Sequence, residues 1–318
     1  MSVVRVGLVG LGSMGRNHAR VLESMDGVEL VGVFDQSIES RESAPYPRSD
    51  SLDELLGSDL DYLTIATPTH THVEIALKAL EVSMPCLIEK PVAMSVEDAK
   101  QLDRAFSEAG VLGGVGHVER FNPAVWEAKK RIEEGELGPI HSIQTRRVGP
   151  FPGRILDVGV ALDLATHDVD ATTWLLGSPY ERVSAEVSRV MPGPHEDLIA
   201  AVGQLENGAG VSHIVNWVSP YKQREIVIVG ATGAFRIDTL EGRLMIFRNG
   251  SLSSTWNEVA QLSGVTQGDV LIPEILRVEP LVREHEEFIK ALQGKNGIVA
   301  TLPESVAVLQ VCESFLAH

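Results

Sequence analysis

Three side chains suited to proton transfer stand at widely separated points of the chain. Lys90 follows the short apolar run Pro85–Ile88, and its ammonium group can stabilise negative charge on an oxygen. Asp163 and His167 stand four residues apart in a helical pattern, so both side chains can point to one side of a helix. A histidine titrates near neutral pH and can take a proton from a hydroxyl group. Brought together by the fold, these residues would form one active site.

A glycine-rich turn near the N-terminus predicts a cofactor site. Gly10, Gly12 and Gly15 follow the apolar run Val3–Val9 with the spacing G-x-G-x-x-G and open a helical pattern. In a dinucleotide fingerprint, the first glycine permits a tight turn, the second admits a pyrophosphate and the third lets helix and strand pack closely. The free N–H groups at the start of the helix bind the phosphates.

Asp35 indicates which dinucleotide binds. It ends the second apolar run, Leu30–Phe34, twenty residues after Gly15. A carboxylate at this point accepts hydrogen bonds from the adenosine ribose and repels a 2′-phosphate. No basic residue follows it until Arg41. The sequence therefore predicts NAD in preference to NADP.

The elements that position these residues alternate between apolar runs and helical patterns over residues 1–117. The runs are Val3–Val9, Leu30–Phe34, Tyr62–Ala66, Pro85–Ile88 and Val111–Val115. The helical patterns are Ser13–Met25, Leu52–Leu56, Thr71–Leu80 and Val96–Ala109, the last with Ser95 as N-cap. Such alternation predicts an α/β fold with a doubly wound parallel sheet, a Rossmann domain.

Residues 118–318 have a different pattern and predict a second domain, an α/β domain with an open, mostly antiparallel sheet. Helical patterns cover Pro123–Ile132, Leu162–Leu176, Glu279–Leu292 and Pro303–Ala317. Alternating segments cover His141–Thr145, Val183–Val190, Ile199–Leu205, Gly210–Trp217 and Glu225–Val229. Because an open apolar face usually marks an interface, we expect a homodimer or homotetramer through this sheet.

The composition excludes several classes of partner and site. A net charge of −17 argues against nucleic acid and anionic membranes as partners. No run reaches the ~20 apolar residues of a membrane helix. Two cysteines in unrelated contexts argue against a disulfide framework and fit a reducing cytoplasm. None of the ten histidines lies in a zinc-ligand pattern, so we expect no metal.

With two further motifs, the chain resembles the glucose–fructose oxidoreductase/inositol dehydrogenase (Gfo/Idh/MocA) family over essentially its whole length. The motifs are Ala66–His72, after the third apolar run, and Glu89-Lys90-Pro91, after the fourth. The resemblance implies that Lys90 hydrogen-bonds the reacting oxygen or acts as the base, that His167 is the general base and that Asp163 orients the sugar or the nicotinamide ribose. The cofactor residues it implies are Gly10, Gly12, Ser13, Met14, Gly15, Asp35, Thr67, Pro68, His72 and Glu89.

Two segments, Gly116–Ala124 and Asn216–Glu225, are similar to the branch of this family that oxidises the 3-hydroxyl of UDP-N-acetylglucosamine or its uronic acid. Guanidinium groups bind phosphate in bidentate fashion, and basic residues gather in the second domain. They are Arg120, Arg146, Arg147, Arg154, Lys222 and Arg224, although any one of them can instead pair with a carboxylate. The predicted substrate contacts are His117, Arg120, Asn122 and Arg154.

Other functions stay open on the sequence. One is the oxidation of inositol, another polyol or a free sugar, and the basic cluster argues mildly against it. Another is a sugar-converting enzyme that recycles its NAD in place. A non-catalytic NAD-binding sensor is a third, although it needs none of the residues Lys90, Asp163 and His167.

Overall fold

A computed structural model describes residues 3–153, 158–250 and 266–317 of the chain. It divides into two compact units, of which the first contains Met1–Val118 with Glu279–Gln310, and the second contains Glu119–Val278 with Val311–His318. The sequence assigned all of residues 118–318 to the second domain. By contacts, however, Glu279–Gln310 packs with the first unit, because α9 (Pro280–Leu292) lies on α1 (Ser13–Ser24).

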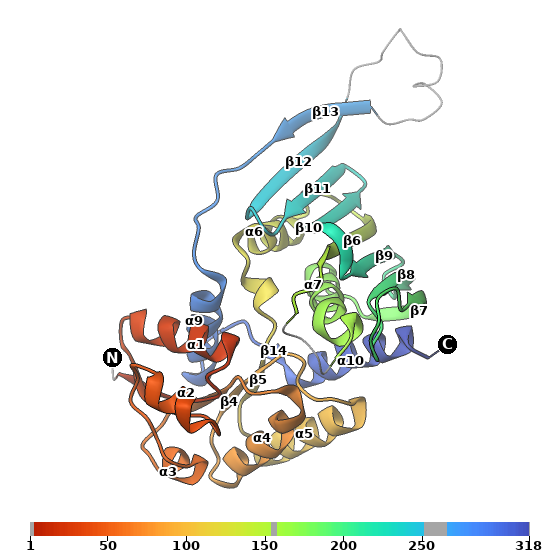
Figure 1. The fold of residues 1–318 in the computed structure, drawn as a ribbon. Coiled ribbons are helices and arrows are strands. Elements are labelled where there is room, and N and C mark those ends of the chain that lie inside the picture. The colour runs from red at the N-terminus through yellow and green to blue at the C-terminus, as the bar shows by residue number, and fades with distance from the viewer. Residues whose placement is uncertain (1–2, 154–157, 251–265, 318) are drawn as a thin grey trace. The chain divides into compact units, whose positions relative to one another are not determined.

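The first unit is a Rossmann-type layer structure, as predicted. Its six-stranded sheet has the order β14-β5-β4-β3-β1-β2, with β14 antiparallel to β5 and the other strands parallel. In Figure 1, α1 and α9 lie on one face of this sheet, and α4 and α5 lie on the other. The strands are β1 (Val4–Val9), β2 (Val28–Phe34), β3 (Tyr62–Ile65), β4 (Cys86–Glu89), β5 (Gly113–Gly116) and β14 (Ala300–Thr301). The further helices are α2 (Ile38–Ser43), α3 (Leu52–Leu56), α4 (His72–Glu81) and α5 (Val96–Ala109). Helix α10 (Leu302–Phe315) begins in this unit and ends in the second.

Local chemistry sets the bounds of α5. Ser95 caps the helix, because its Oγ accepts a hydrogen bond from the backbone N–H of Asp98 at 3.1 Å and donates one to the Asp98 carboxylate at 2.7 Å. Gly110 ends the helix in the left-handed region, at φ 64°. Both ends agree with the sequence prediction.

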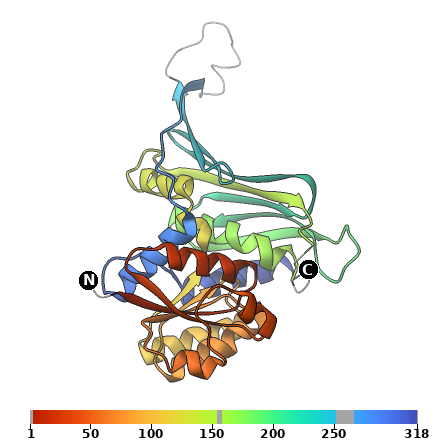
Figure 2. The same cartoon turned by 60° about the vertical axis from the view of Figure 1, so that its left-hand side comes forward.

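The second unit is one large sheet with helices on one face. Its eight strands have the order β13-β12-β11-β10-β6-β9-β8-β7, and β6 and β9 are the parallel pair in an otherwise antiparallel sheet. Figure 2 shows α6 and α7 against one face, and no described helix covers the opposite face. The strands are β6 (Ile140–Pro150), β7 (Tyr180–Ser188), β8 (Leu198–Leu205), β9 (Gly210–Asn216), β10 (Val218–Gly230), β11 (Gly233–Asp238), β12 (Arg243–Gly250) and β13 (Thr266–Leu271). The helices are α6 (Pro123–Glu133) and α7 (Thr166–Leu176).

Each unit has its own apolar core. In the first, residues of β1, α1 and β3 pack around Leu8, Leu22 and Tyr62. In the second, Leu175 of α7 packs with Ile226 and Phe235 of the sheet. These cores fix the strand ends from which the functional side chains project.

Candidate active site

The glycine-rich loop has the geometry that dinucleotide binding requires. Gly10 has a φ of +97°, which an L side chain rarely adopts. A Cβ on Gly15 would collide with the carbonyl oxygen of Gly10, so the close approach of α1 to the loop needs a glycine. A Cβ on Gly12 would enter open space instead, and Ser13 begins α1 directly after it. The loop therefore leaves room for a pyrophosphate beside the N–H groups of the first helical turn.

Asp35 is fixed against this loop at the end of β2. Its Oδ2 accepts a hydrogen bond from the backbone N–H of Leu11 at 2.6 Å, and its Oδ1 accepts one from Ser37 N–H at 2.8 Å. Arg41 lies closer than its position in the sequence indicates: its Nη1 donates to the Asp35 carbonyl at 2.9 Å, and its guanidinium carbon lies 5.4 Å from the centre of the Phe34 ring. The ribose end of the site thus holds a carboxylate and a neighbouring arginine.

We expect Asp35→Ser to improve the kcat/KM ratio of NADP to NAD by about 10²-fold, because it removes the charge that repels a 2′-phosphate. Serine retains an oxygen that can accept from Leu11 N–H. Steady-state kinetics with both cofactors measure the ratio. In the double variant Asp35→Ser/Arg41→Gln much of the gain should disappear. An unchanged ratio in Asp35→Ser would contradict the role of Asp35.

Thr67, Pro68 and Lys90 lie at the same edge of the sheet as this loop. Thr67 and Pro68 come directly after β3, and Lys90 follows its parallel neighbour β4. In open α/β sheets the carboxyl edge of the strands is the ligand-binding edge. Lys90 is half-buried, and its backbone N–H donates to Glu89 Oε2 at 3.1 Å.

His72 connects two loops of this edge. Its buried ring places Nε2 2.8 Å from the Thr67 carbonyl oxygen and Nδ1 3.0 Å from the Pro91 carbonyl oxygen. Burial lowers the pKa of His72, and a neutral imidazole carries one N–H, which it donates to one of these carbonyls at a time. His72 thereby braces the loop that carries Pro68 and the loop that carries Lys90.

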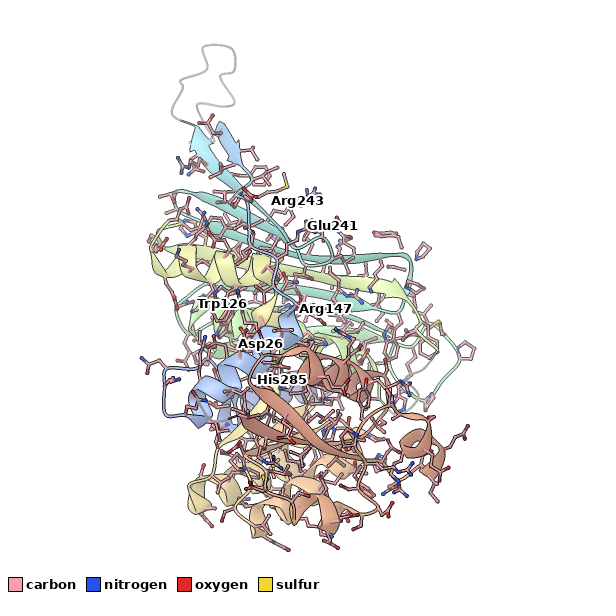
Figure 3. The ribbon with its side chains drawn as sticks, turned by 90° about the vertical axis from the view of Figure 1, so that its left-hand side faces the viewer. Asp26, Trp126, Arg147, Glu241, Arg243 and His285 are labelled. Atoms are coloured by element: carbon pink, nitrogen blue, oxygen red, sulfur yellow. The ribbon has the colours of Figure 1, made fainter. Side chains whose placement is uncertain are left out.

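A buried hydrogen-bonded chain supports Glu89, and sequence reasoning missed its other three members. Glu89 Oε1 lies 2.9 Å from His18 Nε2, His18 Nδ1 lies 2.9 Å from His285 Nε2, and His285 Nδ1 lies 2.9 Å from the Tyr62 hydroxyl. Figure 3 labels His285, which projects from α9. His18 follows Gly15 by three residues on α1. Its closeness to the glycine-rich motif is the sequence feature that could have pointed to it.

The protonation states along this chain follow from burial and partners. Burial and the neighbouring His18 hold the pKa of His285 well below its usual value, and burial raises the pKa of the Tyr62 hydroxyl. Neutral His285 carries one ring N–H, so it donates to only one of its two partners, His18 or the Tyr62 hydroxyl. Burial alone would raise the pKa of Glu89, but His18 and Lys90 lower it below its usual value. The chain holds a carboxylate beside Lys90.

Removing the imidazole from this chain is expected to reduce stability. We expect His18→Phe to lower the free energy of unfolding by about 3–5 kcal/mol at neutral pH, because it leaves the Glu89 carboxylate buried without its partner. Urea denaturation measures the loss. His141→Phe, at an exposed histidine of β6, is the matched control.

The pH dependence of this loss has a definite sign. The lowered pKa of Glu89 means that its contribution is complete above the ordinary carboxyl pKa and is lost as the pH falls through the folded-state value. The difference between wild type and His18→Phe should therefore shrink on acidification. A difference that stays constant with pH would contradict the assigned states.

In the second unit, Asp163 and His167 lie on consecutive helical segments. Asp163 belongs to a π-helical turn, Ala161–Ala165, and His167 to the first turn of α7, and both side chains are half-buried. The sequence predicted one continuous helix over Leu162–Leu176. The π-helical turn is anchored by Glu196, whose Oε1 accepts from the Ala161 N–H at 2.9 Å. π-helical turns are rare in proteins, and those that occur often lie at functional sites.

Comparison with known proteins assigns the family. Residues 4–117 match the model of an oxidoreductase family with an NAD-binding Rossmann fold, GFO/IDH/MocA, and residues 125–236 match the C-terminal domain of the same family. The chain belongs to the GFO/IDH/MocA family. It is an NAD-binding oxidoreductase, and the open space beside Gly12 together with Asp35 fits that cofactor.

Three relatives illustrate the range of this family. UDP-N-acetylglucosamine 3-dehydrogenase of Acidithiobacillus ferrooxidans is 29% identical over 98% of both chains. Its solved structure superimposes with a TM-score of 0.85 over 99% of this chain and 97% of that one, at 26% identity. The scyllo-inositol 2-dehydrogenase (NAD(+)) of Bacillus subtilis is 31% identical over 74% of both chains. The structure of GenD2 from gentamicin A biosynthesis, in complex with NAD, has a TM-score of 0.81 at 25% identity and covers 99% of this chain and 94% of that one.

Two predicted substrate contacts of this GFO/IDH/MocA chain have partners within the second unit. Arg120 is buried, and its Nε donates to Asp170 Oδ2 at 2.9 Å in a buried ion pair. Asn122 caps α6: its Oδ1 accepts from Ala124 N–H and its Nδ2 donates to the Thr239 carbonyl at 2.9 Å. The contacts of both residues with a substrate stay predictions.

The structure says little about the other two predicted substrate contacts, His117 and Arg154. His117 follows β5 and is 2% exposed. Arg154 lies outside the described residues. Among the described residues, no group of three or more histidine, cysteine, aspartate or glutamate side chains is placed to hold a metal ion, and no described helix is long and apolar enough to cross a membrane.

Proposed function

We propose that this chain is an NAD-dependent dehydrogenase that oxidises a secondary alcohol of a sugar, the C3 hydroxyl of a UDP-N-acetylhexosamine or of its uronic acid. The observation that carries the proposal is the full-length likeness to UDP-N-acetylglucosamine 3-dehydrogenase, over 98% of both chains and with a TM-score of 0.85. The likeness to the scyllo-inositol 2-dehydrogenase covers 74% of both chains.

We assign each role from the chemistry of the side chain and from its match to the pattern of the family. The glycine-rich loop and Asp35 would hold NAD, which would supply the acceptor for the hydride of the substrate carbon. His167 takes the hydroxyl proton as the carbonyl forms. Lys90, at the carboxyl end of β4, donates a hydrogen bond to the reacting oxygen and stabilises its developing negative charge. Asp163, four residues before His167, orients the sugar or the nicotinamide ribose.

Formation of NADH from NAD, followed by absorbance with a panel of substrates, tests the proposal. UDP-N-acetylglucosamine and its uronic acid should be oxidised, and myo-inositol, scyllo-inositol and free hexoses should not. Turnover of an inositol alone would replace the proposed substrate by a polyol. Firm NAD binding without turnover of any compound in the panel would favour a sensor or an enzyme that recycles its NAD in place.

We also propose that the open face of the eight-stranded sheet joins copies of this chain in a dimer or tetramer. That face carries the exposed Val202 of β8 and the half-buried Ile214, Val227 and Val229. Apolar side chains gathered on one surface usually mark an interface. Light scattering coupled to gel filtration should give a mass of at least two chains, and a monomer mass would contradict the interface.

A further inference from the structure

Arg224 and Arg147 lie directly opposite each other on two neighbouring strands of the second unit. Arg224 of β10 pairs in register with Arg147 of β6, and the two strands are antiparallel. Residues opposite each other in an antiparallel pair project to the same face of the sheet. Arg147 reaches α7, because its Nε donates to Asp168 Oδ1 at 2.7 Å. Arg224 therefore projects to the face that carries α7, Asp163 and His167.

The two arginines differ in how their charges are balanced. Arg147 is buried and bonded to two carboxylates, with Asp168 at 2.7 Å and Glu119 at 3.0 Å. Burial alone would lower the pKa of Arg147, but the charges of Asp168 and Glu119 outweigh it and raise the pKa. Arg224 is half-buried and forms no ion pair with a described residue. Asp168 and Glu119 therefore neutralise the charge of Arg147, which stands opposite Arg224 in the strand pair.

The surroundings of Arg224 act on its pKa in both directions. Burial and the charge of Arg147 lower the pKa, while Asp168, Glu119 and Asp163 raise it. On balance the pKa of Arg224 is lowered from its usual value, with burial the largest cause.

One edge of the Arg224 guanidinium is held by the backbone, and the other makes no hydrogen bond with a described residue. Nη1 donates to the carbonyl oxygens of Val148, at 2.7 Å, and Gln223, at 3.0 Å, which accounts for both of its hydrogens. Across the described residues, no acceptor is bonded to Nε or Nη2. These two nitrogens form the edge that binds a carboxylate or a phosphate through two parallel hydrogen bonds.

We propose that Arg224 is a substrate-binding residue whose Nε/Nη2 edge holds an anionic group of the substrate, a pair of phosphate or carboxylate oxygens. The proposal rests on the proposed dehydrogenase function and narrows it to anionic sugars, such as nucleotide sugars and sugar acids. It transfers to Arg224 the anion-binding role first expected of Arg120, whose guanidinium is taken by Asp170. The two hydrogen bonds of Nη1 to backbone carbonyls hold the guanidinium in one orientation. An anion bound at the Nε/Nη2 edge would therefore have a defined position, and so would the sugar attached to it.

Calorimetric binding of two anions to the NAD-loaded protein tests the site. UDP presents phosphate oxygens and glucuronate presents a carboxylate, so the two titrations distinguish the two anion sources. We expect Arg224→Gln to weaken binding of the preferred anion by about tenfold or more, since hydrogen bonds to charged groups contribute about 1.5–3 kcal/mol. Arg224→Lys keeps the charge without the fork and should bind with intermediate affinity.

Arg236→Gln is the matched control. Arg236 is exposed on β11 and pairs with Glu225, the residue after Arg224, so it lies on the opposite face of the sheet. Its substitution should leave both affinities unchanged. Equal losses in the two glutamine variants, unchanged affinity in Arg224→Gln, or a wild-type protein that binds neither anion would each overturn the proposal.

The same variants separate this inference from the proposed function. If anion binding depends on Arg224 but no UDP-sugar yields NADH, the anion site stands and the proposed reaction fails. If a UDP-sugar is oxidised and Arg224→Gln keeps the wild-type KM and kcat, the reaction stands and the anion site fails. A raised KM with a largely retained kcat in Arg224→Gln supports both.

Discussion

Lys90→Ala is expected to lower kcat by about 10²–10⁴-fold while the affinity for NAD stays near that of the wild type. Lys90 stands at the ligand-binding edge of the sheet, directly after β4. We assign the glycine-rich loop and Asp35 to the dinucleotide. The described hydrogen bonds of Asp35 are with Leu11, Ser37 and Arg41, and Lys90 is not among these partners. The loss should therefore appear in the chemical step. Single-turnover kinetics and NAD titration measure the two quantities separately.

Two further variants sharpen this result. Lys78 is a half-buried lysine on α4 of the same unit, ion-paired with Asp53, and Lys78→Ala should keep full activity. Lys90→Arg keeps the positive charge, but a guanidinium does not release its proton and so cannot act as a base. Partial activity in Lys90→Arg supports stabilisation of the reacting oxygen, whereas a loss as deep as in Lys90→Ala points to Lys90 as the base. Near-full activity in Lys90→Ala would exclude both roles.

Elements with local signals were predictable from the sequence. The bounds of α5 follow from Ser95 and Gly110, which act within a few residues of themselves. The cofactor loop was predictable for the same reason, because Gly10, Gly12 and Gly15 act on one turn. The strands β11, β12 and β13 were not predicted. They are short strands, and each is stabilised by pairing with the strand beside it: β11 with β10, β12 with β11 and β13 with β12.

Contacts between distant residues were beyond the sequence. His18 and His285 are 267 positions apart, and no periodicity relates α1 to α9. The choice among the arginines was equally hidden. Arg120 and Arg147 look alike in the sequence to Arg224, and only the positions of Asp170, Asp168 and Glu119 distinguish the two neutralised arginines from the third. Such pairings depend on tertiary structure, so a list of basic residues does not identify the one that binds an anion.

His167→Asn is expected to lower kcat by about 10²–10⁴-fold at neutral pH and to change the pH profile as well. A protonated histidine cannot accept a proton, so the wild-type kcat/KM should fall as the pH drops through the ionisation of the base. In His167→Asn the residual activity should lack this acidic limb. Asparagine retains polar atoms at the half-buried position, so the start of α7 should keep its structure.

The pH profile also decides between His167 and Lys90 as the base. If Lys90 takes the proton, the acidic limb persists in His167→Asn and disappears in Lys90→Arg, because a guanidinium does not titrate in the accessible range. His141→Asn, at an exposed histidine of β6, should match the wild type in rate and in profile. When the hydride leaves the substrate carbon, one group must accept the hydroxyl proton. The variant in which the acidic limb of the pH profile disappears therefore identifies that group.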